Sequence, residues 1–430
     1  MTGRQHSPGE RQHPDRIQPL NRSSPPRPLE GITVVDMGQV LAAPFATYLL
    51  HLAGADVIKI EPRGGEWLRQ VDSGLAFATQ NAGKRCISIN MRAPGAAETV
   101  LRLVEHADVF VEGFAPGTAE AMGLGWETVS GRNPQVVYGS LSAFGDSGPY
   151  ANRPGFDHVV QAMSGIMPAT GFEGQPPTKV GAPFLDYGGG MLLAFGLMMG
   201  LAERQRTGRA VRIDTTMLDA GLLLNAGAVV RAATTGADPP RTGNNAFSGA
   251  VASGAFDTAD GLLMVAANKP SQFQRLIEVL DLPELDDGPE LALPGADPER
   301  VDQARRLLRE CFALRPADVW ETELNAAGIP AARVRTLSEV TSEGHTAART
   351  ILQSVPDPAE DAPNRSVSLP GLGVRINGVM PGPVGSATRA GAETRAVLAE
   401  FGFSPDEILG LLEDGTVFEP AQGRIEPTTE

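Results

Sequence analysis

The chain has 430 residues, of which 42% are hydrophobic and 20% charged, and its formal net charge is −15. This composition excludes a disordered protein, and the length predicts two domains instead of one core. The acidic balance argues against nucleic acid and anionic membranes as partners, because both repel negative charge.

The sequence predicts neither a secretion signal nor a membrane span. Residues 1–28 are rich in Arg, Pro, Ser, Gln and His and lack an apolar run, so we expect a disordered extension. The most apolar stretch, 191–202, is too short to cross a bilayer. Cys86 and Cys311 cannot form a disulfide framework, which favours a reducing cytoplasm.

The first two hundred or so residues alternate short apolar runs with helical patterns. The apolar runs predict strands at 32–36, 57–61, 86–90, 109–112, 136–141 and 211–214. Helical periodicity predicts helices between Pro44 and Gly54 and at 96–106, 157–167, 188–206 and 215–234. Strands separated by helices predict βαβ units, and therefore an α/β fold with a Rossmann-like large domain covered on both faces.

The alternation of strand and helix patterns ends at about residue 240. Residues 241–254 are typical of a loop, and 255–267 predict a hairpin around Asp260-Gly261. A helix–turn–strand pattern follows to 334, and the last segment has β-like pieces and helices at 393–401 and 405–412. The expected parts are the extension 1–28, the N-terminal part of the large domain at 29–225, a smaller α+β domain with linkers at 226–345, and a C-terminal segment, 346–430, that returns to the large domain.

Several local motifs point to no site. Gly145-Asp146-Ser147-Gly148-Pro149 matches the nucleophile segment of trypsin-like proteases, but no disulfides or histidine motif accompany it, so a tight loop is favoured. Gly83-Lys84-Arg85 lacks the upstream glycine and the hydroxyl of a P-loop. No G-x-G-x-x-G follows the first strand, and the six histidines have no paired spacing for a metal.

Ten short motifs follow one another along the chain. They are 28–36 (PLEGITVVD), 54–61 (GADVIKIE), 81–85 (NAGKR), 107–112 (ADVFVE), 148–150 (GPY), 153–157 (RPGFD), 181–186 (GAPFLD), 207–209 (TGR), 258–261 (TADG) and 327–330 (AGIP). In this order they resemble the class III CoA-transferases, the CaiB/BaiF family, which includes formyl-CoA transferase and α-methylacyl-CoA racemase. The resemblance covers roughly residues 29–415. It implies an enzyme that moves coenzyme A from an acyl-CoA donor to a carboxylic acid without a metal, and an interlocked homodimer.

The family position of the catalytic aspartate falls on Asp186. By its residues alone, Asp186 fits a plain N-cap as well as a nucleophile, since it follows an apolar run and precedes Tyr187 and three glycines. A helix N-terminus is expected to hold the carboxylate ionised, and the glycines are expected to let a bulky ligand approach the backbone. The resemblance implies that Asp186 attacks the donor thioester, forms a mixed anhydride and then carries CoA as an aspartyl thioester.

The resemblance also implies a set of CoA-binding residues. They are Leu41, Ala42, Arg63, Ile89, Arg92, Gly113, Phe114, Ala115, Gly155, Phe156 and Asp157. Arg63, Arg92 and neighbouring Arg153 are the candidates for phosphate contacts. Two basic positions of the family pattern are Pro62 and Ala121 here, so phosphate recognition is predicted to depend on few arginines.

Two alternatives stay open. One is an enzyme like the α-methylacyl-CoA racemases, which place a histidine where this chain has Phe156; that histidine exchanges the α-proton, which phenylalanine cannot do. His158 lies about 200° further around a helix and is expected to face elsewhere. The other is a non-catalytic acyl-CoA-binding homologue, which would explain the missing basic residues but would not need Asp186 in its glycine context.

Overall fold

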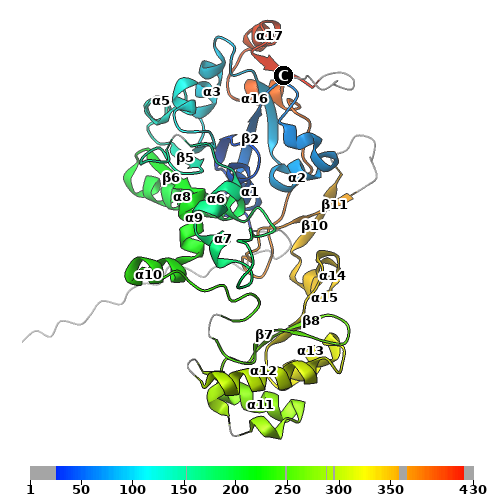
Figure 1. Cartoon of the computed structure of the whole chain (residues 1–430). Coiled ribbons are helices and arrows are strands. Elements are labelled where there is room, and N and C mark those ends of the chain that lie inside the picture. The colour runs from blue at the N-terminus through cyan, green and yellow to red at the C-terminus, as the bar shows by residue number, and fades with distance from the viewer. Residues whose placement is uncertain are drawn as a thin grey trace, which may run out of the picture.

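The computed structural model describes residues 26–420, except 152, 247–248, 287, 294–295 and 358–365. The predicted N-terminal extension lies outside the described residues apart from 26–28. The chain forms a larger body around a central sheet and a smaller body at the other end of the molecule (Figure 1).

A seven-stranded sheet forms the centre of the larger body. Its strands are β1 (Thr33–Met37), β2 (Asp56–Glu61), β3 (Arg85–Ile89), β4 (Val109–Glu112), β5 (Val137–Ser142), β6 (Val211–Thr216) and β12 (Val417–Phe418). Their order is β12-β3-β2-β1-β4-β5-β6, and all pairs are parallel except β12 with β3. The chain runs outward from β1 to β3 and then returns to β4 on the other side of β1. The carboxyl ends of β1 and β4 therefore form a topological switch point, where doubly wound sheets bind ligands.

Helices cover both faces of this sheet. They are α1 (Ala42–Leu52), α2 (Leu75–Asn81), α3 (Ala96–Val104), α4 (Thr118–Ala121), α5 (Trp126–Arg132), α6 (Asp157–Met163), α7 (Ile166–Ala169), α8 (Phe184–Thr207), α9 (Met217–Leu224), α10 (Ala226–Thr235) and the 3₁₀ segment η1 (Trp67–Gly74). Val35 and Met37 of β1 enter a core under α3 and α16 (Thr394–Glu400), whereas Val34 enters a second core under α1 and α8. The predicted burial of the sheet on both faces is confirmed.

Three helix predictions were wrong at their boundaries. The helix expected at 157–167 is divided at Gly165, which has φ +79°, and the one expected at 215–234 is divided at Asn225. α8 begins at Phe184, four residues before the predicted start. The three glycines 188–190 are poor helix formers, but packing against neighbouring elements outweighs that local preference. Asp186 consequently lies inside the first turn of α8.

The glycines of α8 serve helix packing. A Cβ at Gly190 would lie 2.6 Å from the Ala42 carbonyl oxygen of α1, and one at Gly188 would lie 2.9 Å from Leu224 of α9. This close packing at Gly188 and Gly190 argues against the expectation that these glycines admit a ligand. α8 is long and apolar enough to cross a membrane by length and composition, but 56% of its most apolar window is buried, and Leu185, Leu193 and Leu197 pack in the core with α1 and the sheet, as in a core helix.

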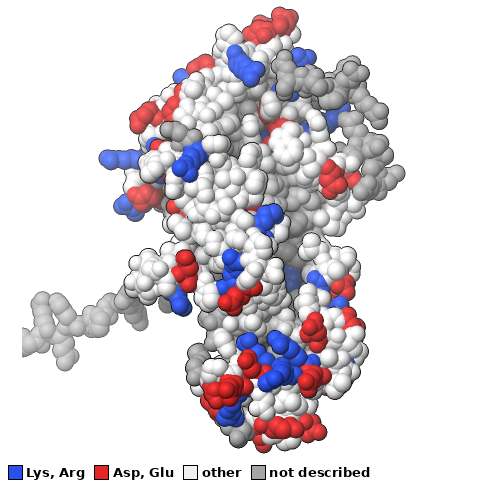
Figure 2. All heavy atoms as spheres, viewed as in Figure 1, with Lys and Arg blue, Asp and Glu red and all other residues white. Residues whose placement is uncertain are grey.

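The smaller body has its own sheet and core. It contains the antiparallel sheet β7 (Ser253–Asp257), β8 (Leu262–Ala266) and β9 (Ala331–Arg333), the helices α11 (Pro270–Leu280), α12 (Pro298–Phe312) and α13 (Ala317–Ala326), and the 3₁₀ turns η2 (Pro283–Leu285) and η3 (Pro289–Ala292). The predicted hairpin is confirmed as β7 and β8. On the face of the smaller body seen in Figure 2, a cluster of basic side chains lies next to clusters of acidic ones.

The chain then returns to the central sheet. The returning elements are α14 (Leu337–Ser342), α15 (Gly344–Arg349), β10 (Leu352–Pro356), β11 (Ser366–Pro370), α16, α17 (Pro405–Glu413) and β12. β10 and β11 pair antiparallel and pack against α1 of the larger body, and β12 pairs with β3. The exact domain boundaries, 225/226 and 345/346, stay a prediction.

Candidate active site

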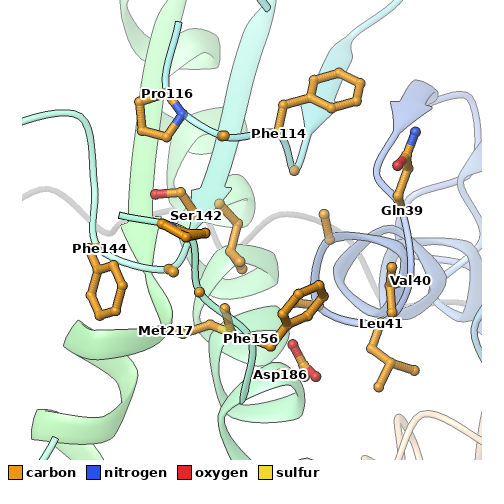
Figure 3. Close-up of a pocket in the computed structure, with 18 of the residues that line it drawn as sticks. Gln39, Val40, Leu41, Phe114, Pro116, Ser142, Phe144, Phe156, Asp186 and Met217 are labelled. Carbon is orange, nitrogen blue, oxygen red and sulfur yellow. The ribbon is translucent and has the colours of Figure 1, made fainter. Parts of the chain in front are cut away.

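A cavity of about 270 Å³ opens at the switch point of the sheet. Its walls come from the turns after β1 and β4, the end of β5 with the loop that follows it, and the first turns of α8 and α9 (Figure 3). The lining residues are mostly apolar, and Arg153 and Asp186 are the charged ones among the described residues. A concave, apolar site with few polar groups at this position of the fold is typical of small-molecule binding.

Asp186 brings a carboxylate to this cavity. It is the third residue of α8, and its carboxylate lies between Phe156 and Leu41 (Figure 3). The N-cap of α8 is Pro183, and no side-chain hydrogen bond caps this helix. Asp186 is therefore not a helix cap. The plain N-cap interpretation of this residue is wrong.

A second carboxylate fixes the start of α8. Asp157, the first residue of α6, accepts the Leu185 N–H at 2.7 Å through one oxygen and the Gln161 side-chain amide at 2.6 Å through the other. Gln161 in turn accepts the Val180 N–H at 2.8 Å. Both side chains are buried, so they hold the segment that precedes Asp186 against α6. Asp157 does not line the cavity, which argues against its predicted contact with CoA.

The electrostatic environment of Asp186 differs from the one expected from sequence. Burial raises the pKa of the Asp186 carboxyl to about 7, and the neighbouring Asp157 charge adds to this effect. This argues against the expectation that the helix N-terminus holds the carboxyl ionised, because the cost of burying the charge exceeds the roughly 0.3–2 kcal/mol that a helix terminus contributes. Near neutral pH the group is poised between its two protonation states.

Most of the predicted CoA-binding residues meet in the cavity wall. They are Leu41, Ala42, Gly113, Phe114, Ala115, Gly155 and Phe156, joined by Arg153. Ile89 does not line the cavity, because its side chain is buried in the core on the α3 side of the sheet. Arg63 and Arg92 are also outside the wall: both are exposed at the carboxyl ends of β2 and β3, and Arg63 stacks over Phe418 at 4.8 Å.

Other reactive or basic side chains are engaged elsewhere. Lys84 is fully buried and donates to Asp36 at 2.9 Å, and Arg85 pairs with acidic groups at the opposite edge of the sheet. Burial raises the pKa of the Cys86 thiol, which disfavours a thiolate. His158 is exposed and stacks on Phe156, with ring centroids 6.3 Å apart.

Some lining residues were not predicted. They are Gln39, Val40, Ala43, Pro116, Leu141, Ser142, Ala143, Phe144, Ala151 and Met217. The position of Gln39 and Val40 directly after the first strand was a usable signal, since ligands of such sheets gather at strand ends. Met217 carries no such signal, because it reaches the cavity through the packing of α9 beside α8.

Comparisons with known proteins agree with this site. The model of CoA-transferase family III matches residues 29–382. The succinyl-CoA–D-citramalate CoA-transferase of Chloroflexus aurantiacus is 34% identical over 79% of this chain and 86% of its own length. The acetyl-CoA:oxalate CoA-transferase of Acetobacter aceti is 33% identical over 83% and 91% of the two chains. The crystal structure of a CaiB/BaiF family protein from Brucella suis superposes with a TM-score of 0.78, at 28% identity over 87% of this chain and all of that one.

The chain therefore belongs to CoA-transferase family III, the CaiB/BaiF family. It is a class III CoA-transferase, an enzyme that transfers CoA between acyl-CoA thioesters and carboxylic acids.

Proposed function

We propose that Asp186 carries the acyl group and then CoA during transfer. The observation that supports this most strongly is the position of its carboxylate in the wall of the switch-point cavity. Ser142 also lines the cavity, but its hydroxyl accepts the Gly145 N–H, and no histidine lines the cavity as a base in the described part of the chain. A carboxylate needs no base once it is ionised.

The proposed reaction proceeds in four substitutions at a carbonyl. An oxygen of Asp186 attacks the donor thioester, its C–S bond breaks, and a mixed anhydride and CoA thiolate form. The thiolate attacks the aspartyl carbonyl, the anhydride C–O bond breaks, and the donor leaves as a carboxylate. The acceptor carboxylate then attacks the aspartyl-CoA thioester and expels the thiolate. Attack of the thiolate on the acceptor carbonyl yields the new acyl-CoA and restores Asp186.

We propose that CoA extends from the cavity along the carboxyl edge of the sheet. The apolar wall suits the pantetheine arm and the reacting thioester. Arg153 in the wall, and exposed Arg63 and Arg92 beyond it, then face the phosphates. Arg153 stacks on Tyr150 at 4.2 Å, which leaves the edges of its guanidinium free to donate.

Replacing Arg92 by alanine is expected to raise the apparent KM for acyl-CoA about tenfold, because a hydrogen bond to a charged group contributes roughly 1.5–3 kcal/mol. The same variant should show an unchanged KM for the corresponding acyl-pantetheine, which lacks the nucleotide phosphates. Steady-state kinetics with both donors makes the comparison. An equal KM for acyl-CoA in the wild type and the variant would remove Arg92 from the proposed site.

The enzyme is proposed to act as an interlocked homodimer in the cytoplasm. Apolar side chains of α8 and α9 are exposed in the single chain, among them Met191, Phe195, Met199 and Leu223 at 51–62%. A second copy would cover such a surface. The free cysteines, Cys86 and Cys311, suit a reducing compartment.

The central experiment is a panel of acyl-CoA donors and carboxylic acid acceptors, read by mass spectrometry. The panel starts from the acids in the names of the relatives, which are succinate, citramalate, acetate and oxalate. Formation of a new acyl-CoA from an acceptor is the expected result. Absence of transfer with every pair would count against the proposed function and would favour the non-catalytic alternative.

Transferase activity is favoured over racemase activity by Phe156. Its ring is 63% exposed and stands beside Asp186, where the racemases place a histidine. We expect no enzyme-catalysed deuterium incorporation at the α-carbon of a 2-methylacyl-CoA in D₂O without an acceptor acid, because phenylalanine cannot exchange a proton. Mass spectrometry of the recovered thioester measures this. Incorporation above the enzyme-free rate would establish the racemase alternative.

A further inference from the structure

The turn after β1 is held in an unfavourable backbone conformation next to Asp186. Val40 has φ +64°, in the left-handed region that β-branched residues rarely adopt. Val40 and its neighbour Leu41 form the part of the cavity wall that faces the Asp186 carboxylate (Figure 3). Strain of this kind persists only where surrounding contacts impose it, and such positions cluster at functional sites.

Three buried charged side chains form hydrogen bonds with the backbone of this turn. The Val40 N–H donates to Glu66 at 2.9 Å, and the Gly38 N–H donates to Asp36 at 2.8 Å. The Gly38 carbonyl accepts from Lys59. Asp36, Lys59 and Glu66 are at most 6% exposed. Buried side chains therefore hold the backbone of the turn at both Gly38 and Val40.

These charges belong to a compensated network. Lys59 lies 3.6 Å from Glu66, and the backbone N–H of Glu66 donates to Glu61 at 3.1 Å. Burial would raise the pKa of Asp36, but Lys59 and Lys84 outweigh it and lower the pKa. Burial would likewise lower the pKa of Lys59, and the acidic neighbours Asp36 and Glu66 reverse this. A buried ionic network usually contributes less to stability than apolar packing would. Its contacts with the strained turn therefore suggest that it serves to hold the backbone of that turn.

We propose that Glu66 is a positioning residue for the transfer reaction: it holds Val40 in its left-handed conformation, so that the wall formed by Val40 and Leu41 keeps its place against Asp186. This inference rests on the proposed function for its effect on turnover. Glu66 does not itself line the cavity, and it acts on the wall through its contact with the Val40 amide.

A double-mutant cycle between Glu66 and Val40 tests the proposal. Glu66→Gln keeps an acceptor oxygen but removes the charge that balances Lys59. We expect kcat to fall roughly tenfold with a change in KM below about threefold, since a charge-assisted contact is weakened. Glycine adopts positive φ without strain, so in the Val40→Gly background the same Glu66→Gln change should lower kcat by about threefold or less. Equal losses in the two backgrounds, or no loss in either, would overturn the proposal.

Asp108→Asn is the matched control. Asp108 also accepts a backbone N–H of β1's first residue, Thr33, at 2.8 Å and pairs with Arg204 at 2.7 Å, but at the opposite end of the strands. The changes in Tm caused by Asp108→Asn and by Val40→Gly should be additive in the double variant, and Asp108→Asn alone should keep the wild-type kcat. Coupling of Asp108 with Val40 as large as that of Glu66 would mean that the cycle reports general destabilisation, and would overturn the proposal.

Thermal unfolding of the same variants separates this inference from the proposed function. Glu66→Gln should lower Tm less in the Val40→Gly background than in the wild type, whether or not the enzyme transfers CoA. If Glu66→Gln alone does not fold, a folded double variant supports the proposal, and a double variant that also fails to fold contradicts it. Absence of transfer in the wild type would contradict the proposed function, while the coupling in Tm would still show whether Glu66 holds Val40.

Discussion

Replacing Asp186 by asparagine is expected to lower CoA transfer by roughly a thousandfold or more, because an amide cannot form the anhydride or the thioester. The fold should survive, since asparagine has nearly the same shape and the Asp186 carboxylate caps no helix. Transfer rates and circular dichroism of the purified variant measure both outcomes. A variant that retains most of its activity would show that the nucleophile has been assigned wrongly.

The same variant carries a stability signature. The folded-state pKa of Asp186 is raised to about 7, so between about pH 4 and 7 this side chain binds more protons in the native state than in the unfolded state. Stability contributed by the protonated group is therefore present below its unfolded pKa and lost as pH rises to 7. Asp186→Asn should equal the wild type in Tm near pH 4 and exceed it by a few degrees at pH 8.

Chemical trapping locates the activated carbonyl. Hydroxylamine added during turnover should leave a hydroxamate on the peptide that contains Asp186, because it attacks aspartyl anhydrides and thioesters. Asp157 is the internal control: its two oxygens are occupied by Leu185 and Gln161, and it does not line the cavity. Modification of Asp157 in place of Asp186 would contradict the proposed mechanism.

The second large effect is expected with pH. Since the nucleophile must be ionised and the pKa of Asp186 is about 7, kcat/KM should level off above pH 7 and fall about tenfold per pH unit below it, or roughly a hundredfold at pH 5. The profile is measured as kcat/KM for the acyl-CoA donor, because acceptor acids that titrate near pH 5 are themselves partly protonated at the low end of this range. A profile that is flat from pH 5 to 8 would contradict either the role of Asp186 or its raised pKa.

Two variants assign this pH dependence. Asp157→Asn removes the negative charge that helps to raise the pKa of Asp186, so the midpoint of the profile should move to lower pH. His158→Gln is the control, because His158 is the histidine stacked on Phe156 at the cavity wall. The His158 variant should keep the wild-type midpoint, and a shift in that variant would assign the titration to the imidazole.

Local sequence patterns predicted the strands of the central sheet. Apolar runs of four to six residues separated by helical periodicity matched β1 to β6 within about two residues. The two-residue strand β12 was missed, because a pairing between Val417 and Ile89 has no local signature. Helix boundaries failed where local preference and packing disagreed, as at the glycines of α8, which contact α1 and α9.

The order of motifs along the sequence determined the family and pointed to Asp186 and to about half of the residues in the cavity wall. Only the tertiary structure decided the pKa of that carboxyl group and which side chains surround it. Its raised pKa comes from burial and from Asp157, and the turn beside it is held by Glu66, which lies 26 residues further along the chain than Val40. Hydrophobic periodicity and turn residues act between near neighbours and can be read along a chain, whereas desolvation, charge pairing and backbone strain depend on side chains that only folding brings together.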